Sequence, residues 1–260
     1  MEDVVVRREE RGSISVLTMQ YRPYNLLGPT LIGAIAAEVT AAQEAGSRAI
    51  ILRSGLRHFS AGADVAQFDA RVEQGGKSQS AIGGVDFLKS LELLPIPIVA
   101  SVHGVCLGGG FELALACDYI VAASSAKIGS VEVALGLHPL LGGIQRQVQR
   151  AGAMRAKEIA MLGRRYDAAT LERWGLVNLV VADDVLEDAM FTIAEEFAHG
   201  PTVADAATKR LVHLAVNEGV LAADEAMAEI QKPIWASEDL KIGLASFRDN
   251  APGLAKFTGR

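Results

Sequence analysis

The stretch Gly104-Val-Cys-Leu-Gly-Gly-Gly-Phe-Glu112 is the part of this chain that decides its fold. The glycines at 108–110 lack a Cβ atom, so their backbone N–H groups can approach a ligand closely. The apolar run that follows, up to Cys117, predicts the first turns of a buried helix. A helix N-terminus exposes unpaired N–H groups, which suit a developing oxyanion. Glu112 is expected within about one helical turn of this site, with no basic neighbour in sequence to neutralise it.

Length and composition predict a globular protein without a membrane span. The chain has 260 residues and is 50% hydrophobic, enough for one large domain or one domain with an appendage. The longest apolar region, 93–123, is interrupted by prolines and ionisable residues and therefore fails as a span. The N-terminus has no secretory apolar segment and is too acidic for a transit peptide, so a cytoplasmic location is expected by default.

Net charge and cysteine content limit the classes of ligand and partner that are expected. The net charge is −6 and the basic residues are scattered, which argues against nucleic acid but allows a small polyanionic ligand held by a few local cations. Cys106 and Cys117 lie in apolar sequence and are expected to be buried free thiols. The five histidines lack metal-ligand spacing, so no metal site is predicted.

Apolar strands alternate with helices in the first two thirds of the chain, which predicts an α/β fold. Strands are expected at 4–7, 14–19, 49–53, 96–102 and 119–122. The segment 8–12 reads as a hairpin turn, 31–45 as a helix, and the polar segment 72–84 as mobile.

Beyond Asp183 the pattern becomes helical throughout. Helices are expected at 186–199, 203–216, 221–235 and 240–249. Such a segment either caps the sheet or packs on another subunit. The change of pattern divides the chain into a core, 1–195, and a helical C-terminal region, 196–260.

A second small-residue turn, Arg57-His-Phe-Ser-Ala-Gly-Ala-Asp64, directly follows a predicted buried strand. Its small residues let the backbone N–H of Ala63 point outward, and Asp64 is placed to cap the next helix. By itself this is an ordinary strand-to-helix turn. Beside the triple glycine, it becomes a candidate for the other half of a two-amide oxyanion hole.

Glu132 is the second candidate carboxylate. Its neighbours Val131, Val133, Ala134 and Leu135 are apolar, a setting that raises a carboxyl pKa and suits proton transfer. A single such glutamate is more often a charge at a helix N-terminus. Two glutamates, each attached to a glycine-rich turn, favour general acid and base catalysis. The chain has no GxxxxGK[ST], GxGxxG, HExxH or GxSxG motif that would indicate another chemistry.

These motifs together resemble the crotonase family, the enoyl-CoA hydratase and isomerase superfamily. The matching segments are residues 57–64, 100–118, 126–132, 142–146, 174–177 and 237–247. The resemblance implies a spiral of β-β-α units with a helical C-terminal trimerisation region, commonly assembled as a homotrimer or a homohexamer. It also implies an acyl-CoA thioester substrate, so CoA belongs to the substrate and no separate cofactor is expected.

The resemblance also implies roles for particular residues. The N–H groups of Ala63 and Gly109 hold the thioester oxygen, Glu112 acts as base on a water, and Glu132 delivers a proton to C2. The reaction implied is hydration of a trans-2-enoyl-CoA to the 3-hydroxyacyl-CoA. The residues expected to contact CoA are Ala61, Ala63, Asp64, Val65, Gly109, Arg22 and Phe247, the last from a neighbouring subunit.

Three departures from the family pattern leave alternatives open. Val131 stands where hydratases usually have proline, Leu140 and Leu141 replace smaller residues beside the acyl channel, and Asn250 replaces a CoA-binding lysine. A double-bond isomerase that uses Glu132 alone is the nearest alternative, and another acyl-CoA reaction of the family is also open. A non-catalytic or RNA-associated homologue is a further alternative. The presence of both glutamates argues against loss of catalysis, and the net negative charge argues against RNA binding.

Overall fold

The computed structural model describes residues 4–65, 68, 72, 80–249 and 253–260. Within these residues the main sheet has six strands, in the order β1-β2-β3-β4-β6-β9. Their bounds are Val6–Arg11 (β1), Ile14–Met19 (β2), Ala49–Ser54 (β3), Ile98–Val102 (β4), Tyr119–Ala123 (β6) and Leu179–Val181 (β9). Only the β1–β2 pair is antiparallel in this sheet.

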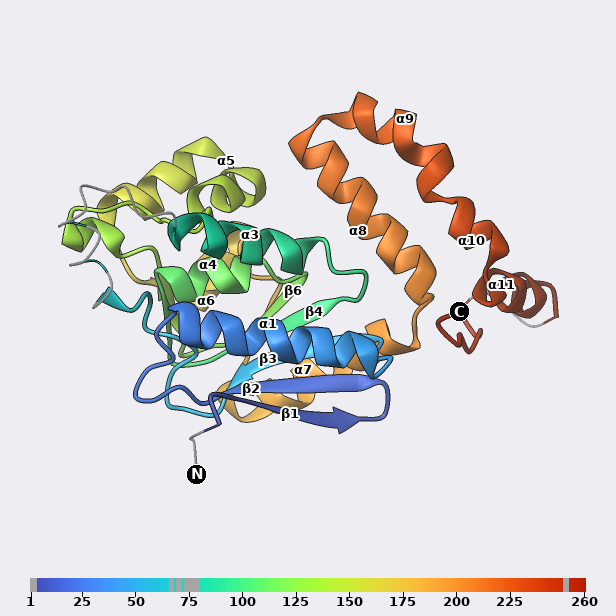
Figure 1. The fold of residues 1–260 in the computed structure, drawn as a ribbon, viewed down its shortest axis with the longest axis horizontal. Coiled ribbons are helices and arrows are strands. Elements are labelled where there is room, and N and C mark those ends of the chain that lie inside the picture. Colours follow the sequence, from blue (N-terminus) through green and yellow to red (C-terminus); the bar gives the residue numbers. More distant parts are fainter. Residues whose placement is uncertain (1–3, 66–67, 69–71, 73–79, 250–252) are drawn as a thin grey trace.

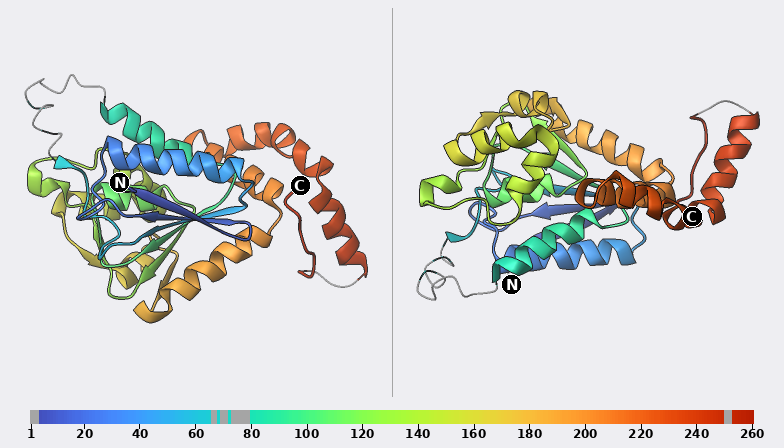
Figure 2. Two further views of the ribbon diagram at one scale, coloured as in Figure 1. Left: turned by 60° about the horizontal axis from the view of Figure 1, so that its bottom comes forward. Right: turned by 90° about the horizontal axis from the view of Figure 1, so that it is seen from above.

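Helices cover both faces of the sheet (Figure 1, Figure 2). Their bounds are Pro29–Glu44 (α1), Ser80–Glu92 (α3), Gly109–Leu115 (α4), Gly143–Leu162 (α5), Ala168–Arg173 (α6), Leu186–His199 (α7), Thr202–Asn217 (α8), Val220–Ile230 (α9), Lys232–Ala236 (α10) and Glu238–Asp249 (α11). Short 3-10 helices span Glu132–Leu135 and Asp183–Val185.

Alternate residues of the central strands face two separate cores, as the two-residue repeat of a strand requires. In β3, Ile50 and Leu52 join the core with α1, α3 and α4, whereas Ala49 and Ile51 join the core with α7. Burial on both faces explains why these strands are continuous apolar runs in the sequence. The predicted α/β architecture is confirmed.

A small second sheet positions the site and was not predicted. It pairs β5 (Val105–Leu107) with β7 (Lys127–Gly129) and β7 with β8 (Tyr166–Asp167). The chain runs from β5 directly into the glycine turn, and from β7 towards Glu132. The N–H of Gly108 donates to the carbonyl of Gly129 at 2.9 Å, so the glycine turn lies beside the segment that carries Glu132.

Two local predictions were wrong in extent, and a third was not tested. Arg8 to Arg11 continue β1 instead of forming a turn, because an edge strand leaves charged side chains in solvent, where Arg8 pairs with Glu38. The helix expected at 221–235 is two helices, since Pro233 cannot donate the N–H that would continue α9. Residues 73–79 of the segment expected to be mobile lie outside the described residues, and 80–84 begin α3.

Helices α8–α11 project from one end of the sheet (Figures 1 and 2), so the predicted helical C-terminal region is present. The predicted boundary between 195 and 196 falls within α7 and stays a prediction. In the part of the chain that the structure describes, none of the helices has the length and apolar character needed to cross a membrane. The cytoplasmic location stays a prediction as well.

Candidate active site

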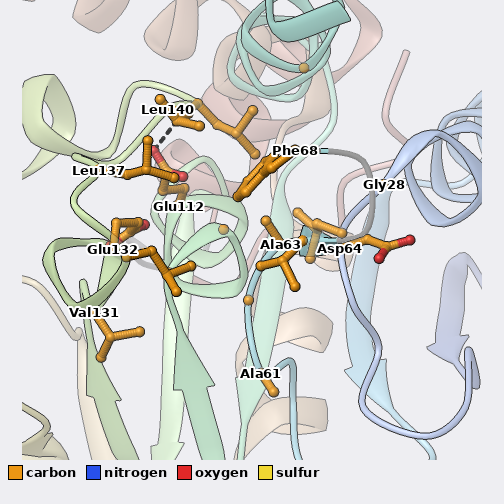
Figure 3. A pocket seen from close by; sticks show the side chains of 18 of the residues that line it. Gly28, Ala61, Ala63, Asp64, Phe68, Glu112, Val131, Glu132, Leu137 and Leu140 are labelled. Atoms are coloured by element: carbon orange, nitrogen blue, oxygen red, sulfur yellow. Dashed lines mark hydrogen bonds between the residues drawn. The ribbon is translucent and has the colours of Figure 1, made fainter. Parts of the chain in front are cut away.

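A cavity of about 620 Å³ lies beside the glycine turn (Figure 3). Its lining comes from the start of α1, the loop after β3, α3, the glycine turn and the segment 131–141. The lining includes seven residues predicted from sequence, namely Ala61, Ala63, Asp64, Val65, Gly109, Glu112 and Glu132. Residues from both glycine-rich turns and both candidate carboxylates therefore meet at one cavity.

The amide of Ala63 faces the glycine turn. Leu27 forms backbone hydrogen bonds with both neighbours of Ala63. Leu27 N donates to Gly62 O at 2.8 Å, and Asp64 N donates to Leu27 O at 2.9 Å. Successive amides of an extended segment point to opposite sides, so the N–H of Ala63 points away from Leu27. A Cβ built on Gly109 would lie 3.6 Å from Ala63 N.

Gly109 is the first residue of α4, so its N–H has no acceptor within the helix. Within the described residues neither this N–H nor that of Ala63 has a hydrogen-bond partner. Gly110 lets the two turns approach, because a Cβ there would lie 2.5 Å from Ser60 Cβ. The two residues with unpartnered amides thus line the same cavity.

Glu112 is 2% exposed and is held by two backbone amides. Its Oε1 accepts hydrogen bonds from Leu141 N at 2.8 Å and Gly143 N at 2.7 Å, of which Figure 3 draws the first. Burial raises the pKa of this carboxyl to about 7, although both amides lower it. The fold also brings Arg146 near Glu112, a cation that its sequence neighbours do not reveal.

Glu132 begins the 3-10 helix Glu132–Leu135, and its Oε1 lies 3.3 Å from the position of a Cβ built on Gly108. Both of its carboxyl oxygens are buried without a hydrogen-bond partner in the described part of the chain. Burial raises the pKa of Glu132, against a lowering by His138. This direction agrees with the prediction from its apolar sequence neighbours, and it favours the protonated acid more than in an exposed glutamate.

The carboxylates of Glu112 and Glu132 lie on one side of the cavity and Ala63 on the other (Figure 3). Val131 and Leu140, two of the departures noted in the sequence, also line it. Arg22 and Phe247 are exposed and do not line this cavity. Their roles stay predictions, and Asn250 lies outside the described residues.

The cavity has lining residues that sequence reasoning missed. They are Leu27, Gly28, Pro29, Ile32 and Gly33 around the start of α1, Ala134, Leu135 and Leu137, and Arg165. The sequence Gly28-Pro-Thr indicated where the helix begins, but it did not indicate which of its residues would line the cavity. Arg165 stands in a polar segment without a motif.

The cavity offers two carboxyl groups that can transfer protons and two backbone N–H groups that can donate hydrogen bonds to an anion. Among the residues that the structure describes, no three His, Cys, Asp or Glu side chains are grouped so that they could hold a metal ion. Cys106 and Cys117 are buried free thiols, as predicted.

This fold is the crotonase fold. The family model for enoyl-CoA hydratase/isomerase matches residues 9–255, and the chain belongs to that family.

Individual relatives agree with this assignment. A protein of Rhizobium meliloti (strain 1021) named a probable enoyl-CoA hydratase is 32% identical over 246 residues, which cover 92% of this chain and 93% of the relative. The crotonyl-CoA hydratase of Syntrophomonas wolfei is 32% identical, with 95% of each chain covered. The crystal structure of an enoyl-CoA hydratase subunit I from Geobacillus kaustophilus HTA426 is 31% identical, superposes with a TM-score of 0.89, and covers 100% of both chains.

Proposed function

We propose that this protein adds water to the conjugated double bond of a trans-2-enoyl-CoA thioester and forms the 3-hydroxyacyl-CoA. The observation that carries the proposal is the meeting of two buried carboxyl groups of raised pKa and two unpartnered amides at one cavity. The names of the relatives support the same reaction.

The amides of Ala63 and Gly109 act on the thioester oxygen. Addition of water at C3 moves the electrons of the double bond onto this oxygen and leaves an enolate. Two fixed N–H donors stabilise that charge without reorganising, and removing one such donor typically costs about 10²–10³ in rate. The apolar surroundings of the cavity strengthen this interaction.

The two glutamates handle the protons. Ionised Glu112 accepts a proton from the water while the water oxygen bonds to C3. Protonated Glu132 then gives its proton to C2 as the enolate collapses to the thioester. Glu112 is left protonated and Glu132 ionised, and transfer of one proton between them restores the starting state.

Part of the cavity serves the CoA moiety in this proposal. Ala61, Asp64 and Val65 line it, and the exposed Arg165, which also lines it, supplies the cation for phosphate in the role that the sequence suggested for Arg22. Phe247 contributes only through a second subunit. Self-association is supported by large apolar side chains exposed on α8–α11, namely Val212, Val216, Leu221, Trp235, Leu244 and Phe247.

The direct test is the ultraviolet absorbance of the enoyl thioester, followed with crotonyl-CoA and longer enoyl-CoA substrates. We expect wild type to remove this absorbance, and Glu112→Gln and Glu132→Gln each to slow the loss strongly. Absence of any loss at every chain length would contradict the proposal. If Glu112→Ala keeps full activity on a 3-enoyl-CoA, the protein is the isomerase instead.

A further inference from the structure

Arg146, near the start of α5, contacts the same backbone segment that holds Glu112. Its Nη1 donates to the carbonyl oxygens of Leu141 at 3.3 Å and Gly142 at 3.2 Å. The N–H groups of Leu141 and Gly143 donate to Glu112 Oε1. The segment 141–143 therefore lies between a guanidinium on one side and the candidate base on the other.

One peptide group makes this arrangement explicit. The group that joins Gly142 to Gly143 offers its carbonyl oxygen to Arg146 and its N–H to Glu112. In a planar trans peptide the C=O and N–H point in opposite directions. Holding the carbonyl on one side thus directs the N–H at the carboxylate on the other, and a charged donor polarises the peptide and strengthens that bond.

The two glycines give the two side chains the space they occupy. A Cβ on Gly142, which has a φ of 94°, would lie 2.5 Å from Arg146 Nη1. A Cβ on Gly143 would lie 2.9 Å from Glu112 Oε1. Each side chain can reach the peptide group only because the adjacent residue has no side chain of its own.

Glu92, at the end of α3, fixes the guanidinium. Its two oxygens accept from Arg146 Nε at 2.8 Å and Nη2 at 2.7 Å, a bidentate pair that sets the guanidinium plane. Arg146 is 8% exposed. Glu132 lies near Glu112, and Arg150 lies near Arg146. Asp118, Lys209 and His213 line a second cavity together with Glu92 and Arg146.

We propose that Arg146, held by Glu92, is a positioning residue that fixes the peptide groups of 141–143 so that their amides orient Glu112 towards the cavity. The proposal rests on the role proposed above for Glu112 as the base. Arg146 itself does not line that cavity, so its effect is exerted through the backbone.

Arg146→Lys tests this role because an ammonium cannot reproduce the fork that engages Glu92 and both carbonyls at once. We expect kcat to fall by about 100-fold, the loss typical of a small misplacement of a reacting group, with little change in KM. The rise of kcat/KM with pH is expected to move to higher pH, because Glu112 loses amide bonds that lower its pKa. Arg155→Lys is the matched control on the same helix, since Arg155 pairs at 2.6 Å with Glu158 at the surface, and it should change neither quantity.

A second measurement does not depend on turnover. Carbon-13 NMR of protein labelled at the glutamate carboxyl, with the Glu112 signal assigned through Glu112→Gln, reports the titration of Glu112 directly. We expect Glu112 to titrate at higher pH in Arg146→Lys than in wild type. If Arg146→Lys does not fold, Glu92→Gln provides the same comparison.

The two measurements separate the two proposals. If wild type hydrates no enoyl-CoA, the proposed function is wrong. The titration of Glu112 still tests the positioning role of Arg146 in that case. If Glu112 titrates at the same pH in wild type and variant, the positioning role is wrong, whether or not kcat falls.

Discussion

Replacing Glu112 by Gln is expected to stabilise the folded protein at neutral and higher pH. Burial raises the pKa of Glu112 from 4.5 to about 7. A carboxyl whose pKa is raised by folding contributes most to stability below its unfolded pKa, and this contribution is lost as the pH rises to the folded pKa. Wild type therefore loses stability between these two values, whereas the Gln variant has no proton to release at this position.

The magnitude follows from the two pKa values. The difference between 4.5 and about 7, at about 1.4 kcal/mol per pH unit, corresponds to about 3 kcal/mol. Ionising Glu112 in its buried position lowers the free energy of unfolding by this amount, and the Gln variant avoids that loss.

The assay is urea unfolding of wild type and Glu112→Gln at one protein concentration, over a series of pH values from about 4 to about 8. The free energy of unfolding of the variant, relative to wild type, should increase across this range by up to about 3 kcal/mol. Glu225→Gln, at an exposed position of α9, serves as the control for an exposed glutamate. A difference that stays constant with pH, or that grows in favour of wild type, would refute the reasoning.

Two further substitutions test the amide pair and the acyl end of the cavity. Gly109→Ala places a methyl group 3.6 Å from Ala63 N without a clash, so we expect the circular dichroism spectrum and the Tm to be retained. We expect kcat/KM to fall by about 100-fold or more. Wild-type activity in this variant would exclude the amide pair from catalysis. The Cδ1 atom of Leu141 lies 3.7 Å from a Cβ built on Gly109, and its Cδ2 atom lies close to Gly84, so this side chain occupies space in the cavity. Leu141→Ala should therefore raise kcat/KM for longer enoyl chains, relative to crotonyl-CoA, by about 10-fold. An unchanged ratio between chain lengths would show that Leu141 does not limit chain length.

The two glycine-rich turns and Glu112 could be predicted because their signals are local. Each turn follows a buried apolar strand, and Glu112 is attached directly to the triple glycine. Glu132 was predicted for the same reason, from the apolar residues on both sides of it. Such features need only the chemistry of neighbouring residues and the periodicity of strands and helices.

The parts that sequence did not reveal depend on contacts between distant segments. The strands of the second sheet have two or three residues, too few for an alternating pattern. Arg146 lies beside Glu112 only because α5 packs against α4, and nothing near residue 112 indicates a cation. The break between α9 and α10, in contrast, was readable at Pro233.

Hydration of crotonyl-CoA in oxygen-18 water, followed by mass spectrometry of the product, tests the central claim most directly. The proposed reaction predicts a 3-hydroxyacyl-CoA that carries one heavy oxygen at C3 with wild type, and far less of it with Glu112→Gln. Recovery of the thioester without heavy oxygen, or with only its double bond moved, would contradict hydration as the activity of this protein.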